Sequence, residues 1–221
     1  MYDKLIFRVF LALLVGLFAI CADARLSSAL IAYYPLEGDA RDATGNGHDG
    51  TIVGDPQAIP GMFGQALEFD GVDDYVLVTD YVPISGAADR AVTAWVRMVS
   101  TDVQGIVAWG QIAGQSKWVI RLSTKGQLRL EIEGAAIKGN SRLADGEWHH
   151  IAVSFANDGT PALGDVDLYA DGTLQNHANA ALQINTSPTG NLEIGRNLKN
   201  DGFFEGSIDE VKIYDRALSV D

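Results

Sequence analysis

Short runs of alternating apolar and polar residues follow one another along the chain from residue 30 to its end. The runs are rich in Val, Ile, Leu, Tyr and Trp, and Gly, Asp and Asn separate them. A period of two is typical of β-strands with one face in a core, whereas a helical period is almost absent from this part of the chain. The pattern predicts eleven strands, at 30–36, 65–69, 75–79, 91–99, 105–109, 117–123, 127–132, 147–155, 165–170, 191–195 and 206–214. Because no helices intervene, we expect an all-β fold, an antiparallel sandwich or barrel.

Individual runs predict more local features. Asp171-Gly172 stands between two alternating runs, and Asp-Gly readily adopts the positive φ angles of a two-residue type I′ hairpin. Residues 165–170 alternate strictly, which predicts a strand with one solvated face. The run at 91–99 is nearly all apolar and predicts a central strand that is covered on both sides.

The first 24 residues have a different pattern. Lys4 and Arg8 precede an uncharged apolar run at 9–22, and the small-residue pattern Ala-Asp-Ala ends the segment at Ala24. This order is typical of a secretory signal peptide that is cleaved after Ala24. The alternative is an uncleaved membrane anchor, but the apolar run is short for a span that needs roughly 20 residues. We therefore expect 1–24 to be a signal peptide.

The remaining segment, 25–221, is long enough for one domain with a substantial core. The single cysteine, Cys21, would leave with the signal peptide, so the mature chain would have neither a thiol nor a disulfide. A formal net charge of -13 disfavours nucleic acid and anionic lipid as partners and is compatible with divalent cations. We expect an exported protein, secreted, at the cell surface or periplasmic, whose mature chain does not insert into a membrane.

Seven motifs occur in order between residues 30 and 219. They are LIAYYPLEGDARDATGNGHDGTIVG at 30–54, FGQALEFDGVDDYVLV at 63–78, AVTAWVRM at 91–98, GEWHHIAVSF at 146–155, VDLYADGTL at 166–174, LEIGRN at 192–197 and FFEGSIDEVKIYDRALS at 203–219. Together they resemble the laminin-G-like jellyroll family of the concanavalin A-like lectin/glucanase superfamily. The resemblance implies a two-sheet antiparallel jellyroll sandwich with its core at about 30–219. It also implies that a calcium ion is often present and that the domain is often one module of a larger secreted or surface protein.

The superfamily includes glycoside hydrolases, whose chemistry requires a pair of catalytic carboxyls. A retaining glycosidase places two carboxyl groups about 5–5.5 Å apart, and laminarinase-like relatives carry them on one strand of the form E-x-D-x-x-E. No such strand is present: Glu131 and Glu133 share a predicted face but lack a third acid, and a solvated strand face explains them. Zinc-ligand spacing, a serine nucleophile elbow and a Walker loop are also absent from the sequence. We expect the protein not to be an enzyme.

Acidic residues beside glycine-rich turns make calcium the candidate cofactor. Calcium takes six to eight oxygen ligands from carboxylates, backbone carbonyls and water. The resemblance implies ligands from the turn after the first strand and from the last strand, which gives Asp39, Asp70 and Asp209 as the expected ligands of a structural ion. The alternative is that these aspartates cap local amides in turns without any metal.

Asp209 stands out in the last predicted strand. Strict alternation puts Asp209 on the same face as Val211 and Ile213, and the adjacent Glu210 on the opposite face. A carboxylate on an apolar face is costly unless something pairs with it. A calcium ion is one possible partner, and backbone amides are the other.

Sugar binding would require exposed aromatic platforms. Trp109, Trp118 and Tyr81 stand near predicted strand ends or loops and are the candidate ligand-binding residues, although ordinary packing is the favoured explanation for the two tryptophans. Trp95 and Trp148, inside apolar strands, are expected in the core. A lectin function therefore depends mostly on the family resemblance.

The sequence as a whole predicts an exported, non-catalytic jellyroll module that binds glycan or an extracellular or surface protein and holds a structural calcium ion. The first alternative is an adhesion or scaffolding domain without a glycan ligand. The second is a relative of the glycoside hydrolases. No nucleic-acid partner is expected.

Overall fold

The computed structural model describes residues 29–112, 116–132, 134–175, 180–198 and 201–219. The predicted signal peptide and Cys21 lie outside the described residues. The chain divides into two compact units, Met1–Leu30 and Ile31–Asp221, and the second contains nearly all of the strand residues. Within the described ranges, no helix is long and apolar enough to cross a membrane.

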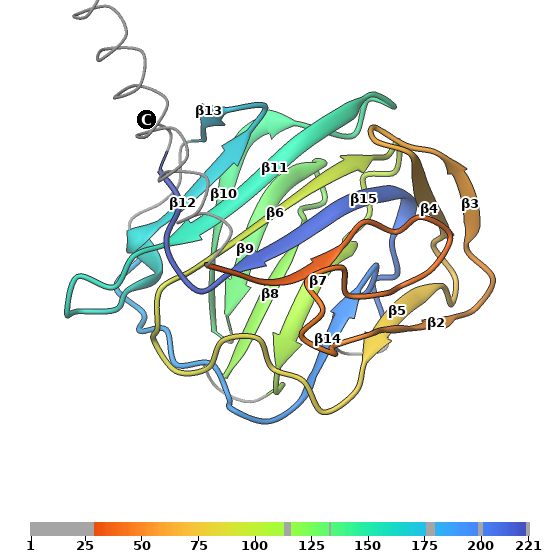
Figure 1. Ribbon diagram of the computed structural model, residues 1–221. Helices are drawn as coiled ribbons and strands as arrows, with labels where there is room; N and C mark the ends of the chain where they lie inside the picture. Colours follow the sequence, from red (N-terminus) through yellow and green to blue (C-terminus); the bar gives the residue numbers. More distant parts are fainter. Residues whose placement is uncertain (1–28, 113–115, 133, 176–179, 199–200, 220–221) are drawn as a thin grey trace, which may run out of the picture. The chain divides into compact units, whose positions relative to one another are not determined.

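Two antiparallel sheets form the second unit (Figure 1). The first sheet has the order β13-β12-β11-β6-β15-β4-β3, and β1 also pairs with β15. Its strands are β1 (Leu30–Tyr34), β3 (Gln57–Pro60), β4 (Gln65–Asp70), β6 (Arg90–Arg97), β11 (Trp148–Phe155), β12 (Val166–Ala170), β13 (Thr173–Leu174) and β15 (Glu205–Tyr214). The second sheet has the order β10-β9-β8-β7-β14-β5-β2. Its strands are β2 (Thr51–Val53), β5 (Tyr75–Val78), β7 (Gly105–Gly110), β8 (Lys117–Leu122), β9 (Gln127–Ile132), β10 (Ala135–Arg142) and β14 (Asn191–Ile194).

The all-β jellyroll prediction is confirmed, and each of the eleven predicted strands is present. The pattern missed β2, β3, β10 and β13, which are short or polar and lie towards the sheet edges. The predicted hairpin is also confirmed, since Asp171 and Gly172 have φ angles of 50° and 72° and Ala170 pairs with Thr173. One 3₁₀ turn, η1 (Leu163–Asp165), precedes β12.

Aromatic side chains fill the space between the two sheets. Trp109 on β7 and Trp118 on β8 are paired across the strands and fully buried, and their rings stack with centroids 5.8 Å apart. Trp118 also meets Phe155 of the opposite sheet at 6.3 Å. These contacts join the sheets through large apolar surfaces, which supply most of the driving force for packing.

A fully buried arginine lies among these rings. The guanidinium of Arg90, at the start of β6, is 5.0 Å from the centroid of the Trp118 ring. It donates hydrogen bonds to the carbonyls of Ile84, Gly86 and Ala88 and to the hydroxyl of Thr186. Burial lowers the pKa of Arg90 to about 10, so the side chain remains charged at neutral pH. One side chain thus connects the loop before β6 with the segment before β14.

The last strand contains a β-bulge. Glu210 has a φ of 57°, and the pairing of β15 with β6 shifts register between Asp209 and Lys212. Because of the bulge, Val211 and Ile213 enter the core, whereas Asp209 lies opposite Trp95 on the outer face of the sheet, away from the core. The predicted common face of Asp209, Val211 and Ile213 is therefore wrong.

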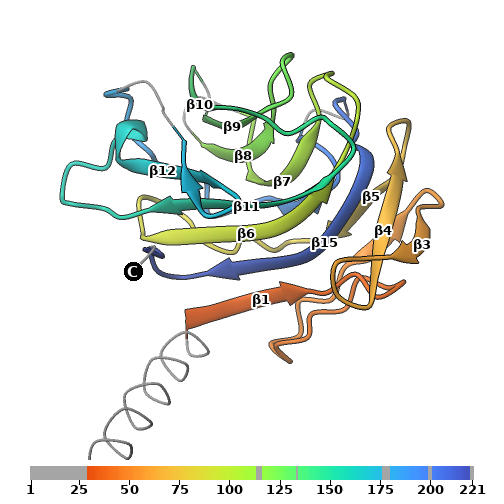
Figure 2. The same ribbon diagram turned by 90° about the horizontal axis from the view of Figure 1, so that it is seen from above.

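The same strand has two partners on one edge. Residues 205–208 of β15 pair with β4, and β1 also pairs with β15 (Figure 2). The carboxylate of Glu210 accepts hydrogen bonds from the Tyr33 hydroxyl of β1 and the Lys212 ammonium, each at 2.5 Å. These contacts hold the bulged residue in an unusual backbone conformation.

A histidine connects β11 to the β12–β13 hairpin. Nδ1 of His149 is 2.8 Å from the carboxylate of Asp171, and Nε2 is 3.0 Å from that of Asp145. Burial alone would lower the pKa of His149, but the hydrogen bonds to Asp171 and Asp145 outweigh it and the pKa is raised. The imidazolium form is the one that can donate to both carboxylates.

Replacing Arg90 should strongly destabilise the fold. We expect Arg90→Met to lower the free energy of unfolding by about 3 kcal/mol, because several buried carbonyls lose their donor. Urea denaturation followed by tryptophan fluorescence measures this. Arg41→Met is the matched control, since the Arg41 side chain is 80% exposed and the change should stay below about 0.5 kcal/mol. Equal effects of the two substitutions would contradict the role of Arg90.

Stability should depend on pH through His149. A group with a raised folded pKa contributes stability that is complete below its ordinary pKa of about 6.5 and is lost as the pH rises through the folded value. Both carboxylate partners are half-exposed, so we expect the contribution to be at most about 1 kcal/mol. Urea unfolding of the wild type and of His149→Gln at pH 6 and pH 9 tests this: the difference between the two proteins should be larger at pH 6. A difference that stays constant or grows with pH would refute the assignment.

Candidate functional site

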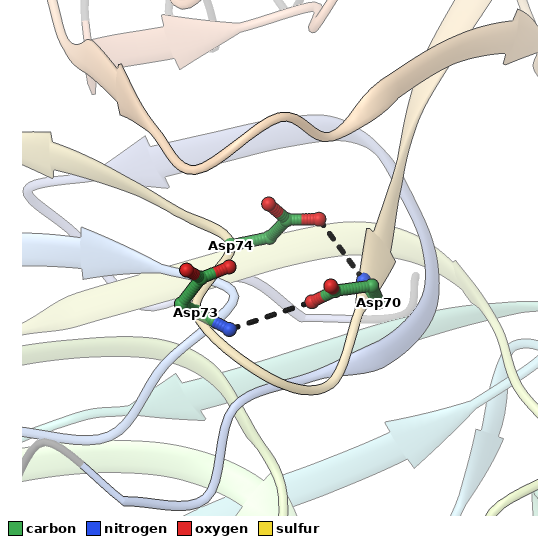
Figure 3. A group of neighbouring side chains, drawn as sticks. All are labelled: Asp70, Asp73 and Asp74. Atoms are coloured by element: carbon green, nitrogen blue, oxygen red, sulfur yellow. Dashed lines mark hydrogen bonds between the residues drawn. The ribbon is translucent and has the colours of Figure 1, made fainter.

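A cluster of aspartates marks the turn between β4 and β5. Asp70 ends β4, and its Oδ1 accepts hydrogen bonds from the amides of Val72 (2.8 Å) and Asp73 (3.4 Å). The carboxylate of Asp74 accepts from the amide of Asp70 at 3.1 Å and from the amide of Asp55 at 2.7 Å. Figure 3 shows the bonds that connect the three clustered aspartates. Asp70 and Asp74 thus cap backbone amides, as the sequence allowed for turns of this kind.

The same cluster also presents oxygen ligands. Asp70, Asp73 and Asp74 each offer one carboxylate oxygen, and the three oxygens lie within 4.8 Å of one another. Asp74 is buried, whereas Asp70 and Asp73 are exposed. Such a set of hard oxygen donors suits calcium chemically, and backbone carbonyls or water would have to complete the shell. We refer to these three residues as the acidic corner.

A hollow of about 630 Å³ adjoins the acidic corner at the end of the first sheet. Its lining is rich in carboxylates, with one arginine among them: Asp55, Gln57, Glu68, Phe69, Asp70, Asp73, Asp74, Arg97, Met98, Val99, Gly146, Glu205, Gly206 and Ser207. A hollow of this volume and mixed polarity can hold a small ligand with many hydroxyl groups.

A row of side chains leads into this hollow across four strands. Trp148, Arg97, Ser207 and Glu68 lie opposite one another on β11, β6, β15 and β4, on the outer face of the sheet. The guanidinium of Arg97 lies 5.2 Å from the centroid of the Trp148 ring, 3.2 Å from the hydroxyl of Ser207 and 3.7 Å from the carboxylate of Glu68. The row therefore combines an aromatic ring, a cation, a hydroxyl and a carboxylate.

The structure corrects the predicted locations of two tryptophans and excludes two others as sugar-binding platforms. Trp95 and Trp148 are partly exposed on the outer face, although their strands predicted a core location. Trp109 and Trp118 are fully buried, so neither offers a surface platform for a sugar. The missed signal was Arg97, which stands two residues after Trp95 and thus marks its face as the polar one.

Tyr81, the third predicted ligand-binding residue, lies half-buried in the loop after β5. It is partly buried against the core and stacks on His48, with ring centroids 3.8 Å apart. Burial and the charge of Asp42 raise its pKa to about 12. Through these contacts Tyr81 packs the loop after β5 against the core and His48.

The structure does not bring the three predicted calcium ligands together. Asp209 is fully buried beneath the β3–β4 turn, and its Oδ2 accepts from the amides of Met62 (2.8 Å) and Phe63 (3.1 Å). Asp70 is paired opposite Glu205, four residues before Asp209 on β15, which places the two aspartates roughly 13 Å apart along the strands. Asp39 forms an ion pair with Arg41 and lines a separate hollow.

Asp209 nevertheless retains an unsatisfied atom. Its Oδ1 is buried and has no hydrogen-bond partner among the described residues. Burial raises the pKa of Asp209, and the two amide donors only partly oppose that effect. A buried carboxyl with one unpaired oxygen is stabilised either by protonation or by a cation.

Glu131, one of the two acids considered for catalysis, is fully engaged by cations. Its carboxylate accepts from Lys117 at 2.8 Å and from Arg129 at 2.9 Å, and Arg121 also donates to it. Burial alone would raise the pKa of Glu131, but the hydrogen bond from Lys117 and the charge of Arg121 outweigh it and lower the pKa. A general acid needs the opposite shift. Glu133 lies outside the described residues.

Several solved structures share this fold. Domain 4 of AbnA, a GH43 extracellular arabinanase from Geobacillus stearothermophilus, in complex with arabinotriose, is 23% identical over 86% of this chain and 94% of that domain, with a TM-score of 0.65. The binding domain of Paraclostridial Mosquitocidal Protein 1 is 16% identical over 88% of this chain, with a TM-score of 0.68. Botulinum neurotoxin type C, whose cell entry is described as dependent on interaction with two ganglioside molecules, is 17% identical over 89%, with a TM-score of 0.60. The chain spans 50% of each of these two toxin chains.

At such identities the likeness to solved structures shows the fold alone. No curated protein sequence matches the chain. A laminin G family profile, described as the concanavalin A-like lectin/glucanases superfamily, matches residues 70–221, which is more than half of the chain. The match begins at Asp70 and so includes the acidic corner, Arg97, Trp148 and all of β15. The chain therefore belongs to the concanavalin A-like lectin/glucanases superfamily.

Proposed function

We propose that the protein is a non-catalytic glycan-binding module and that the hollow beside the acidic corner binds the sugar. The observation that carries the proposal is the row of Trp148, Arg97, Ser207 and Glu68: the last three line the carboxylate-rich hollow, and the Trp148 ring lies beside it against Arg97. A pyranose or furanose presents apolar C–H groups and hydroxyls together, so its recognition calls for an aromatic ring beside paired donors and acceptors. The row supplies each of these groups within one surface.

The chemistry of the described acids supports binding rather than catalysis. Glu131 is held ionised by three cations, and Asp209 is covered by the β3–β4 turn. The acidic corner holds its carboxylates within 4.8 Å, but Asp70 and Asp74 already accept backbone hydrogen bonds. The solved structures with this fold include a domain in complex with arabinotriose, which is consistent with a sugar ligand for this chain.

A protein ligand is the alternative, and exposed apolar residues favour it. Val72 in the acidic corner's turn is 68% exposed, and Val99 on the lining of the hollow is 67% exposed. Apolar side chains near a polar hollow occur in protein interfaces as well as in sugar sites. On this reading the chain is an adhesion or scaffolding domain. In either case we propose that it acts outside the cytoplasm, as the predicted signal peptide indicates.

We also propose that calcium binds at the acidic corner. The three oxygens of Asp70, Asp73 and Asp74 are the closest set of acidic ligands among the described residues, and Asp70 belongs to the predicted ligand set. The ion would order the turn between β4 and β5, which forms one wall of the hollow. Asp70 and Asp74 accept hydrogen bonds from backbone amides, whereas the carboxylate of Asp73 is exposed. Asp73 could therefore bind the ion without giving up such a hydrogen bond.

Glycan binding can be tested with an array of neutral oligosaccharides, arabinotriose included, followed by calorimetry on the best ligand. We expect Trp148→Ala and Arg97→Ala each to weaken binding by about 5- to 30-fold, because each removes a contact worth about 1–2 kcal/mol. Leu174→Ala, at an exposed position on β13, is the control and should bind as the wild type does. Absence of binding across the array with calcium present would refute neutral-glycan binding in the hollow and favour a protein ligand there.

Calcium binding can be tested by thermal unfolding after the metal has been stripped. Calcium at a hundred times its dissociation constant should stabilise the fold by about 2.7 kcal/mol, and Asp73→Asn should remove most of this gain. Asp215→Asn, at an exposed position after β15, is the control. An unchanged midpoint in the wild type would contradict calcium binding, and a gain abolished by Asp39→Asn instead would place the ion in the predicted first-strand turn.

A further inference from the structure

The outer face of the second sheet carries a pocket of a different character. On β8, Trp118 and Ile120 point into the core, so Lys117, Val119 and Arg121 lie on the opposite face. Glu131 lies opposite Val119 on the neighbouring strand β9. These four side chains line a pocket of about 270 Å³ together with Val103, Asn197, Leu198, Asp201 and Gly202.

Cations gather around one carboxylate at this pocket. Three cations, Lys117, Arg121 and Arg129, surround the single carboxylate of Glu131, and all three donate to it. Asp201 on the rim is the second acid and is exposed, so the described lining residues carry two positive and two negative charges, and Arg129 adds a third cation beside the pocket. Three cations on one carboxylate are unusual for a chain with a net charge of -13.

The arrangement is more than an ion pair at the surface. The side chain of Lys117 is only 5% exposed and that of Arg121 17%, so both charges are largely removed from water. Arg121 and Arg129 lie directly opposite each other on adjacent strands, where like charges destabilise a sheet. Burial lowers the pKa of Arg121, and the charge of Arg129 adds to that effect against the attraction of Glu131.

The guanidinium groups also keep unused donors. Nε of Arg121 and Nε of Arg129 are buried and have no hydrogen-bond partner among the described residues. A buried donor without an acceptor is destabilising, so an anion that reached Nε of Arg121, the arginine that lines the pocket, would relieve an existing penalty. Arginine is also the side chain whose donors best match the two oxygens of a carboxylate.

We propose that this pocket binds the carboxylate of an acidic sugar residue, such as a uronic acid. Arg121 and Lys117 receive the carboxylate, and Val119, 2% exposed on the pocket floor, contacts the apolar face of the ring. The volume is just below the roughly 300–1,000 Å³ of pockets for drug-sized ligands and suits one monosaccharide residue. That the bound carboxylate belongs to a sugar rests on the proposed glycan-binding function. That the pocket binds an anion rests on the residues of the pocket alone.

The pocket and the hollow beside the acidic corner have separate residues. The pocket belongs to β8, β9 and the segment after β14, whereas the hollow belongs mainly to β4, β6 and β15. A glycan with both neutral and acidic residues would therefore have two independent contact points. Substitutions in the pocket should leave binding of neutral sugars unaffected, and substitutions in the hollow should leave binding of acidic sugars unaffected.

Titrations of the ¹⁵N-labelled protein with D-glucuronate, D-glucose and acetate would test the proposal. We expect glucuronate to shift the amide signals of Val119, Arg121 and Glu131, and glucose to leave them unchanged. Arg121→Gln and Lys117→Gln should each weaken glucuronate binding by at least about tenfold. Binding should also weaken between 20 mM and 300 mM salt, because screening reduces attraction between charges.

Arg129→Gln is the matched control, since Arg129 donates to the same carboxylate but does not line the pocket. It should change glucuronate affinity less than about threefold. The thermal midpoint of each variant shows whether it has folded, and Val119→Ala, which keeps every charge, is a second variant that should reduce affinity for glucuronate more than for acetate.

The outcomes separate this proposal from the proposed function. Binding of glucuronate that depends on Arg121 but not on Trp148 would support the acidic-sugar pocket, even if every neutral glycan failed. Equal affinity for acetate and glucuronate would refute recognition of the sugar ring and show that the pocket is a simple anion site. No shift with either anion would overturn the pocket while neutral glycan binding, if present, stood unaffected.

Discussion

The bulge at Glu210 is the constraint on which the first sheet depends. A regular strand would turn either Asp209 into the core or Val211 out of it, whereas one extra residue lets Val211 and Ile213 pack inside while Asp209 lies outside. A positive φ at a residue other than glycine costs on the order of 1 kcal/mol or more, and the hydrogen bonds of Glu210 to Tyr33 and Lys212 offset part of it. Through this strand β6, β4 and β1 become one sheet.

The consequences of the bulge extend to the candidate site. Residues 205–208 pair with β4 only because the strand stays regular before Asp209, and this pairing sets Glu205 opposite Asp70 at the acidic corner. The same stretch puts Ser207 between Arg97 and Glu68. Asp209 itself holds the β3–β4 turn through the amides of Met62 and Phe63. A single irregularity thus aligns the row of polar side chains and supports the turn beside it.

Much of the fold could be predicted from the sequence, because long alternating strands have a strong period. The strands β2, β3 and β13 were not predicted, because two to four residues are too few to show a period of two. Side-chain direction was harder to predict: in the apolar run that became β6, periodicity alone cannot say which face meets the other sheet, so Trp95 was expected inside. Trp109 stands near a strand end on β7, so a surface position was considered for it beside ordinary packing. The displacement of Asp209 could not be predicted either, since no residue in its segment requires a bulge and the partners that stabilise it are distant in sequence.

The burial of Trp109 and Trp118 also constrains where recognition can occur. Arg90 packs over the Trp118 ring and donates hydrogen bonds to carbonyls of the loop before β6. The rings of Trp109 and Trp118 therefore join the two sheets and are not available to a ligand. Polar recognition is therefore left to the outer faces, and there the two sheets differ in charge. The end of the first sheet collects carboxylates around Arg97, whereas the second collects cations around Glu131. Because each cluster lies on rigid strands, the difference in charge is a fixed property of the fold, and ligands of opposite charge should select opposite faces.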